Sequence, residues 1–260
     1  MNPYLSAIFV YPIKSLDGSP VSNARVVGRG GLENDRRFAM FEADGRVING
    51  KRYEELHRVR SSVDRERVTL WVDGDGARGI DYRFGDPPAP LEDWLSDYLG
   101  TPVLCREDRE GGFPDDTAAP GPTVISEATL AEVASWIPSV KGVEEMRERL
   151  RPNLIIADVP AFWEDRLYAE QGSTVRFRIG DVEVDGVNPC ARCPVPSRNP
   201  RTGEVALLFQ KTVAQRREST LPAWANRSRF DHFYRLSVNT AVPDSESERV
   251  FRVGDPVTIP

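Results

Sequence analysis

The chain has 260 residues, and its 34 Lys and Arg against 40 Asp and Glu give a net charge of −6 at neutral pH. This length suits one large domain or two modest ones, and the negative balance argues against non-specific binding to nucleic acid or to anionic membranes, which requires a positive field. No apolar run approaches the roughly 18 residues that cross a bilayer, and the start of the chain lacks a signal-peptide pattern, so we expect a cytoplasmic protein with no nucleic-acid and no membrane partner.

The first hundred residues predict a succession of strands separated by turns. Alternating and β-branched runs predict these strands at 5–11, 24–27, 37–41, 46–49, 68–72 and 80–84. The last two flank Asp73-Gly74-Asp75-Gly76, which favours a hairpin turn because the spaced ligands and closing Glu of a calcium loop are missing. Apolar residues at helical spacing then predict a short helix from Leu91 to Leu99.

Residues 106–122 are charged and rich in Gly and Pro, which predicts a linker between two parts of the chain. After it, Ser126 is a good N-cap residue for a helix. Helices are predicted at 127–136, 143–150 and 205–216, and strands at 154–156, 175–179, 182–187, 234–238 and 257–259. The pattern predicts a mainly β (α+β) fold with a few helices, divided into residues 1–118 and 119–260.

Two of the three cysteines lie in the run Asn188-Pro189-Cys190-Ala191-Arg192-Cys193, after a strand-like stretch. A thiolate binds soft and borderline metals strongly, and a neighbouring arginine favours the thiolate over the thiol. A thioredoxin-like dithiol is disfavoured, because the prolines after Cys193 exclude a regular helix there. A structural zinc site would need two more ligands, for which Cys105, His57 and His232 remain. A pair of inert buried cysteines also stays open, and the spacing alone does not decide.

Three short motifs carry cations to the ends of predicted elements. Tyr11-Pro12-Ile13-Lys14-Ser15 ends the first strand, Asp35-Arg36-Arg37-Phe38 leads into another, and Arg151-Pro152-Asn153 lies between a helix and a strand. Lys, Arg, Ser and Asn at such ends hold phosphate groups through charge-assisted and bidentate hydrogen bonds. Taken alone, each motif is more often a surface ion pair or a turn.

These motifs in this order, with Gly31-Leu32 before Asp35-Arg36, Arg201-Thr202-Gly203 after the cysteines and Val253-Gly254-Asp255-Pro256-Val257 near the end, resemble a known family. It is the MOSC-domain family, named for the C-terminal domain of molybdenum cofactor sulfurase, and within it the mitochondrial amidoxime-reducing component and bacterial reductases of N-hydroxylated bases. The likeness runs from Tyr4 to Ile259. It implies a MOSC N-terminal β-barrel domain at 1–118 and a β-barrel-like MOSC domain at 119–260.

The resemblance implies a molybdenum cofactor, in which a molybdopterin dithiolene holds the metal, and chemistry independent of pyridoxal phosphate. It implies that Cys193 is the catalytic residue and the protein ligand of molybdenum, with Cys190 close by but not a ligand. The residues expected to grip the pterin and its phosphate are Lys14, Ser15, Arg36, Arg151, Asn153, Ser126 and Arg192.

The implied activity is that of a molybdenum-cofactor oxidoreductase, which reduces small N-hydroxylated substrates from N–OH to N–H with release of water. The chain has no cysteines left for an iron–sulfur cluster, so its electrons are expected from a separate protein, a ferredoxin, flavoprotein or cytochrome. The loop after Cys193, Pro194 to Arg201, departs from the relatives' sequence and alters the wall beside the metal. The alternative function is a carrier or binding protein for the cofactor, or for sulfur on it, without turnover.

Overall fold

The computed structural model describes residues 2–64, 66–73 and 79–259, and within them the fold is mainly β with four α-helices, as the sequence predicted. Eight strands form the largest sheet: β1 (Tyr4–Val10), β2 (Ser19–Val21), β9 (Val124–Ser126), β10 (Leu154–Ala157), β11 (Val175–Ile179), β12 (Val182–Ala191), β13 (Arg235–Ala241) and β15 (Val257–Thr258). Their order across the sheet is β15-β11-β12-β13-β9-β10-β1-β2. Strands from both halves of the chain therefore share one sheet, while the division predicted at 118/119 stays a prediction.

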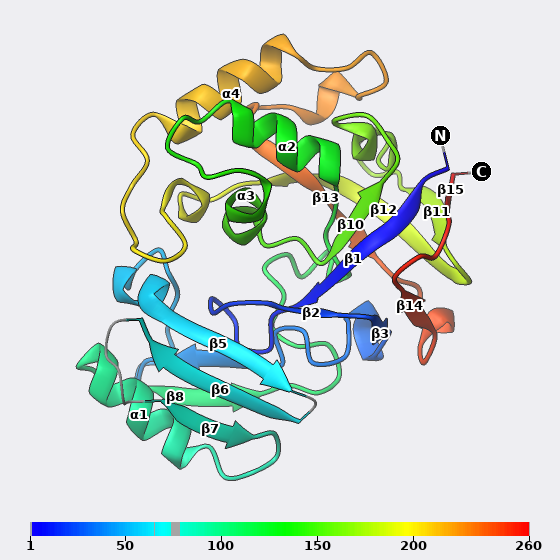
Figure 1. Cartoon of the computed structure of the whole chain (residues 1–260). Helices are drawn as coiled ribbons and strands as arrows, with labels where there is room; N and C mark the ends of the chain where they lie inside the picture. The colour runs from blue at the N-terminus through cyan, green and yellow to red at the C-terminus, as the bar shows by residue number, and fades with distance from the viewer. Residues whose placement is uncertain (1, 65, 74–78, 260) are drawn as a thin grey trace.

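The sheet closes on itself where β1 meets the start of β15, which gives it a barrel-like form. Tyr4 in β1 forms an antiparallel bridge with Pro256, immediately before β15. The Leu5 N–H donates to the Asp255 carbonyl at 2.9 Å, and the Val257 N–H donates to the Pro3 carbonyl at 2.8 Å. Figure 1 shows the two termini side by side at this closure. Closing a sheet on itself removes exposed edges, which would otherwise pair with other chains.

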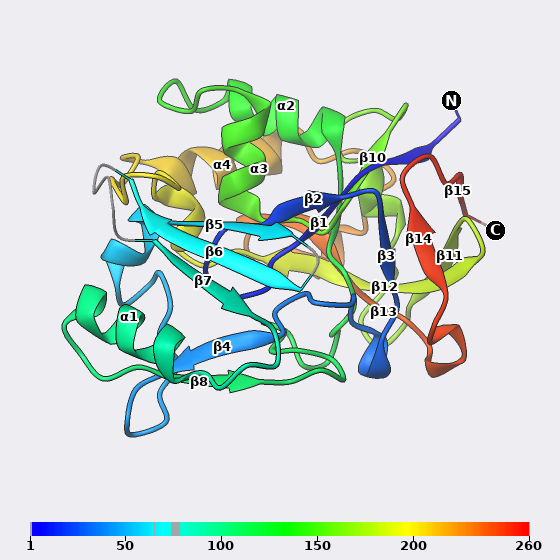
Figure 2. The ribbon, with the colours of Figure 1, turned by 60° about the horizontal axis from the view of Figure 1, so that its bottom comes forward.

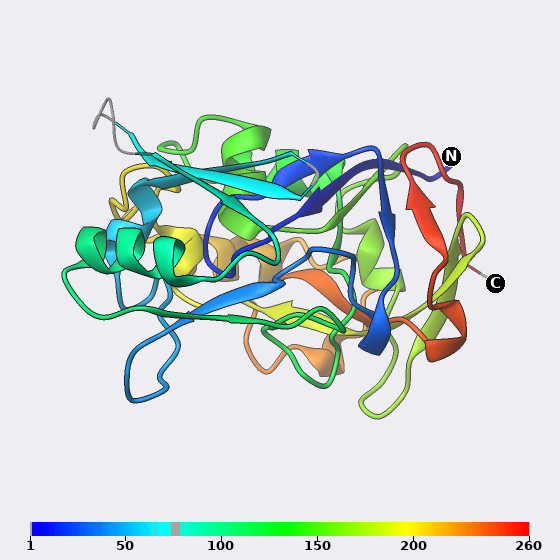
Figure 3. The same ribbon diagram turned by 90° about the horizontal axis from the view of Figure 1, so that it is seen from below.

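The remaining strands form smaller sheets. β5 (Val59–Asp64), β6 (Arg67–Val72) and β7 (Ile80–Arg83) pair in antiparallel fashion, and β4 (Phe38–Phe41) pairs with β8 (Leu104–Glu107). Figure 2 shows β4 and β8 side by side below the β5–β7 sheet. α1 (Ala89–Leu99) packs on β7 and β8, and its Leu91 and Leu95 enter the apolar core between these sheets. β14 (Val250–Arg252) pairs with β3 (Asn23–Arg25), as Figure 3 shows from below, and so brings the end of the chain back to its beginning.

Three helices cover one face of the large sheet: α2 (Glu127–Ser135), α3 (Val143–Leu150) and α4 (Phe209–Ser219). Leu130, Met146 and Val213, one from each helix, belong to a single buried apolar cluster with strand residues. α2 begins where the sequence predicted, because the Ser126 hydroxyl accepts a hydrogen bond from the Thr129 N–H at 3.1 Å. Within the described ranges, every helix is too short or too polar to cross a membrane.

Some predicted elements differ from the structure. Residues 46–49 are not a strand, because after the turn at Gly45 only Val47 forms a bridge with β4. The helix predicted from 205 begins at Phe209, since Leu208 has a φ of 62° and cannot continue a right-handed helix. The predicted linker at 106–122 starts inside β8, and its remainder is built into the wall of a cavity. Strands β2, β5, β8, β9 and β14 were not predicted, and residues 74–76 of the predicted hairpin turn lie outside the described residues.

Candidate functional site

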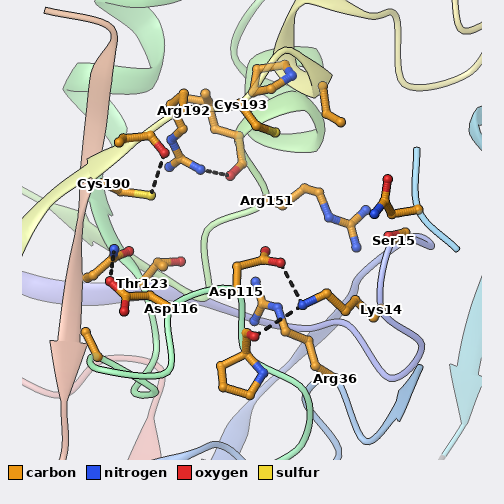
Figure 4. A pocket seen from close by; sticks show the side chains of 18 of the residues that line it. Lys14, Ser15, Arg36, Asp115, Asp116, Thr123, Arg151, Cys190, Arg192 and Cys193 are labelled. Atoms are coloured by element: carbon orange, nitrogen blue, oxygen red, sulfur yellow. Dashed lines mark hydrogen bonds and ion pairs between the residues drawn. The ribbon is translucent and has the colours of Figure 1, made fainter. Parts of the chain in front are cut away.

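A cavity of about 870 Å³ lies between segments of the first and second halves of the chain. Six of the predicted site residues line it: Lys14, Ser15, Arg36, Arg151, Arg192 and Cys193. Figure 4 shows Lys14, Arg36 and Arg151 on one side of the cavity, with Cys190, Arg192 and Cys193 on the other. Cavities of this size hold large organic ligands or cofactors.

The pairing of the central strands explains why three motifs meet here. β9 and β10 run parallel with Val124 opposite Leu154, so the residues just before them, Thr123 and Asn153, lie together. β1 runs antiparallel to β10, so the end of β1 and the loop that carries Lys14 and Ser15 lie at the edge where β10 begins. Arg151 belongs to the turn into β10 and therefore arrives at the same edge.

Lys14, Arg36 and Arg151 form a cluster of cations that we call the cation cluster. The Lys14 ammonium group lies 2.7 Å from an Asp115 carboxylate oxygen and donates to the carbonyls of Phe113 and Pro114 at 2.9 and 3.2 Å. Arg36 pairs with Asp35, its neighbour in the chain. Arg151 donates to the Leu16 carbonyl, and no carboxylate of the described residues lies within 4.0 Å of its guanidinium group.

Tyr11 holds the two guanidinium groups of this cluster against its ring. The centre of the Arg151 guanidinium group lies 4.4 Å from the ring centroid, and that of Arg36 lies 5.5 Å from it. Both distances suit a cation–π interaction. The Tyr11 hydroxyl donates to the Pro152 carbonyl at 3.0 Å, which fixes the ring. Tyr11 stands in the first of the sequence motifs, but this role of its ring was not predicted.

The electrostatics of the cluster favour an anion. Burial lowers the pKa of Arg151, and the positive charge of Arg36 lowers it further. The surrounding cavity walls act to raise the pKa of Asp115, although its carboxylate is open to the cavity, but the charges of Arg36 and Lys14 outweigh this effect and lower the pKa to about 2. A bound anion would relieve the repulsion between the two arginines and replace the water that each of them has lost.

The backbone of this wall is unusual at three of the predicted residues. Ser15, Arg36 and Arg151 have φ values of 77°, 48° and 52°, in the left-handed region that favours glycine. Arg151 adopts this conformation as the residue that ends α3, where its N–H donates to the Arg147 carbonyl at 2.7 Å. Non-glycine residues in this region cost of order 1–3 kcal/mol each and cluster at functional sites.

The opposite wall carries the cysteine pair. Cys190 lies at the end of β12, Cys193 follows it, and both are free thiols that are partly exposed to the cavity. Residues Val195–Ser197 form a single 3-10 turn, so no regular helix follows Cys193, as the prolines predicted. The partial exposure of both thiols argues against the alternative of a buried inert pair.

Two arginines hold residues 192–198, which we call the cysteine loop, by hydrogen bonds to the protein. Arg192 donates to the Leu236 carbonyl at 3.0 Å, to the Leu150 carbonyl at 2.9 Å and to the Ser237 hydroxyl. Its guanidinium group is thus bonded to the protein, and we expect it to position the loop rather than to grip a ligand. Arg149, which the sequence analysis missed, donates to the carbonyls of Pro196 and Arg198 at 2.9 and 2.6 Å.

Two predicted residues do not line the cavity. Asn153 is completely buried, and its side chain accepts a hydrogen bond from Arg36 at 3.3 Å and donates one to the Phe9 carbonyl at 3.0 Å. Ser126 is also completely buried, and its hydroxyl caps α2. Asn153 therefore supports a member of the cation cluster, whereas Ser126 has a helix-capping role.

The alternative of a structural zinc site lacks the ligands that it needs beside Cys190 and Cys193. Cys105 lies in the separate apolar core around α1, where burial and the nearby Glu92 raise its pKa to about 12. In residues 2–64, 66–73 and 79–259, no three His, Cys, Asp or Glu side chains lie close enough together to hold a metal ion. Two partly exposed thiols on one wall and three cations on the other fit a different ligand, one that carries a soft metal and an anionic group at separate positions.

Comparisons with known proteins identify the family of the chain. Residues 2–91 match the family described as the MOSC N-terminal beta barrel domain, and residues 122–258 match the family described as the MOSC domain. The chain is 23% identical to mitochondrial amidoxime-reducing component 1 of Homo sapiens, over 97% of this chain and 82% of that protein. It is 24% identical to molybdenum cofactor sulfurase of Oryza sativa subsp. japonica, over 78% of this chain but only 29% of that longer protein.

Among solved structures, a chain described as "Crystal structure of an hypothetical protein" aligns with 100% of this chain and 67% of its own length. The TM-score is 0.41 and the sequence identity 12%, a similarity too low to support an argument.

Proposed function

The chain belongs to the MOSC family, and from this premise we propose that it binds a molybdenum cofactor in the cavity and reduces N-hydroxylated compounds. The observation that carries the proposal is that one cavity joins the cation cluster to the thiol of Cys193. The name of the human relative refers to amidoximes, which are N-hydroxylated amidines, and that of the rice relative refers to the molybdenum cofactor.

The residues on the two walls have separate tasks in this proposal. Lys14, Arg36 and Arg151, with the Ser15 hydroxyl, would hold the phosphate of the cofactor, and Cys193 would be the protein ligand of its metal. The bound cofactor would supply the two-electron chemistry that N–OH reduction requires. Arg192 and Arg149 would keep the cysteine loop in place, because each is tied to backbone carbonyls.

A separate protein would supply the electrons. The chain has three cysteines, of which Cys105 lies apart from the other two in its own apolar core, so it offers no set of four for an iron–sulfur cluster. We propose a ferredoxin, flavoprotein or cytochrome as the donor and the cytoplasm as the place of action, where free thiols persist.

Elemental analysis tests the cofactor. The protein would be made in a host that produces the cofactor, and molybdenum and oxidised pterin would be measured per chain for the wild type, Cys193→Ala and Cys190→Ala. We expect near-stoichiometric molybdenum in the wild type and loss of molybdenum in Cys193→Ala. Cys190→Ala also removes a thiol sulfur, three positions away, and should retain its molybdenum. Absence of molybdenum and pterin from the wild type would overturn the proposal.

The similarity to molybdenum cofactor sulfurase favours a second candidate, a protein that binds or hands over the cofactor without turnover. Reduction of benzamidoxime with a chemical reductant in place of a donor protein separates the two functions. Turnover that is lost in Cys193→Ala supports the reductase. A protein loaded with molybdenum that turns over no N-hydroxylated compound would instead be assigned to the carrier class.

A further inference from the structure

A carboxylate of the protein itself, that of Asp115, pairs with one member of the cation cluster and lies in the field of the other two. Asp115 lies 2.7 Å from the Lys14 ammonium group, and Figure 4 shows it between Lys14, Arg36 and Arg151. The Asp115 side chain is 79% exposed, whereas that of Lys14 is 15% exposed. The carboxylate is therefore open to the cavity, where an entering anion would compete with it for Lys14.

The next residue anchors the same segment to a different place. Asp116 accepts a hydrogen bond from the Asn239 side chain on β13 at 3.2 Å and another from the Ala118 N–H at 3.0 Å. Two adjacent carboxylates of this segment thus have separate partners, in addition to the bonds that the Phe113 and Pro114 carbonyls accept from Lys14. Release of Asp115 from Lys14 would leave the bonds of Asp116 unchanged.

The contact made by Asp115 is one that a stronger anion can replace. An ion pair with an exposed carboxylate contributes little to stability, because water competes for both charges. A phosphate group brings more than one negative charge and three acceptor oxygens, and arginine binds such a group through two parallel hydrogen bonds. Arg151 donates to the Leu16 carbonyl and has no carboxylate within 4.0 Å among the described residues. A phosphate group would give its guanidinium group an anionic partner.

We propose that Asp115 is a built-in counter-ion, which occupies the anion subsite of the empty protein and gives way when a phosphate group enters. The identity of that phosphate as part of a molybdenum cofactor rests on the proposed function, whereas the exchange of anions does not. Because Asp115 competes with the ligand, its removal should tighten phosphate binding, and phosphate binding should free the Phe113–Asp116 segment from Lys14.

Inorganic phosphate is the probe that tests this exchange. Its affinity would be measured by calorimetry on the full chain made in a host that lacks the cofactor, for the wild type, Asp115→Asn, Asp116→Asn and Lys14→Met. We expect Asp115→Asn to bind phosphate at least threefold more tightly than the wild type and Lys14→Met to bind it more weakly. Asp116→Asn is the matched control, with the same change of charge one residue away, and should bind like the wild type.

Hydrogen exchange distinguishes displacement from a simple gain of positive potential. In the wild type, phosphate should speed exchange of the Phe113 amide, which donates to the Arg36 carbonyl at 2.9 Å, and should leave that of Ala118, which is held by Asp116, unchanged. In Asp115→Asn, phosphate should change neither. Equal or weaker phosphate binding by Asp115→Asn, no binding by either protein, or unchanged exchange in the wild type would each overturn the proposal. Molybdenum content tests the proposed function separately from the counter-ion role. If the wild type holds no molybdenum but Asp115→Asn still binds phosphate more tightly, the proposed function is wrong and the counter-ion role is supported.

Discussion

The Arg36 guanidinium group donates a hydrogen bond at 3.3 Å to the side-chain oxygen of Asn153, which lies 117 positions further along the chain. The Asp-Arg motif of the first half and the Arg-Pro-Asn motif of the second half therefore form one unit. Asn153 also accepts from the Thr123 N–H at 3.2 Å, so one buried amide connects the cation cluster to the starts of two central strands.

Substitution of Asn153 by alanine should destabilise the protein by about 2–4 kcal/mol. The variant would leave the Thr123 N–H and the Phe9 carbonyl without their side-chain partner in a fully buried place, and each such loss costs about 1–3 kcal/mol. Chemical denaturation measures the change. Asn23→Ala, at an exposed asparagine whose side chain donates to the Ser22 hydroxyl, is the control and should stay within about 0.5 kcal/mol of the wild type. An equally small change in Asn153→Ala would contradict the supporting role.

Replacement of Arg192 by lysine should lower the molybdenum content almost as much as replacement by alanine. Lysine keeps the charge but cannot reach Leu150, Leu236 and Ser237 together, because it lacks the planar fork of donors. Molybdenum per chain, measured beside the thermal midpoint, separates loop geometry from general unfolding. Arg201→Lys, at an exposed arginine paired with Glu148, should keep its metal. Full retention of molybdenum in Arg192→Lys would show that charge alone suffices.

Glu164 should make a contribution to stability that is lost as pH rises from about 5 to 8. Burial, and next the negative charge of Asp165, raise the pKa of Glu164 to about 7 from an ordinary value of 4.5. Below pH 4.5 both the folded and the unfolded states keep this proton. Between 4.5 and 7 the unfolded state loses it first, so the folded state binds more protons and loses stability as pH rises.

Glu164→Gln should remove this contribution, since the amide does not titrate. The free energy of unfolding would be measured by denaturation at pH 5 and at pH 8. Its drop between these two values should be about 2–3 kcal/mol larger in the wild type than in Glu164→Gln. Glu55→Gln, at an exposed side chain, should follow the wild-type curve. The same drop in Glu164→Gln as in the wild type would mean that Glu164 is ionised in the folded protein.

Gly112→Ala should destabilise the wall of the cavity more than Gly45→Ala destabilises a surface turn. Both glycines have positive φ, 65° and 83°, but a Cβ on Gly112 would lie 2.8 Å from the Arg36 carbonyl oxygen, whereas one on Gly45 meets nothing within 4 Å. We expect a loss of about 2–4 kcal/mol at Gly112, from backbone strain and overlap together, and about 1 kcal/mol at Gly45, from backbone strain alone. Denaturation midpoints measure both, and equal losses would contradict the close packing at Gly112.

Much of the site could be predicted because its motifs are local. The run from Asn188 to Cys193 and the cations Lys14, Arg36 and Arg151 stand at the ends of strands and helices, and those ends follow from periodicity and from Gly, Pro and capping residues. Ser126 was predicted to bind the cofactor but does not line the cavity, and the reason is physical. A good N-cap residue satisfies its own helix first, and here its hydroxyl is bonded to Thr129 inside the core.

The sequence by itself determined the mainly β fold, the order of the motifs and the residues able to hold a metal or an anion, because alternation, capping and residue chemistry act over a few neighbouring positions. Only the tertiary structure decided that a charged, Gly- and Pro-rich stretch predicted as a linker would place Asp115 among three cations, and that Arg149 and Tyr11 would support the two walls. These contacts join residues up to about 140 positions apart, as between Tyr11 and Pro152. Strand pairing sets such distances, and no local pattern records which strands will pair.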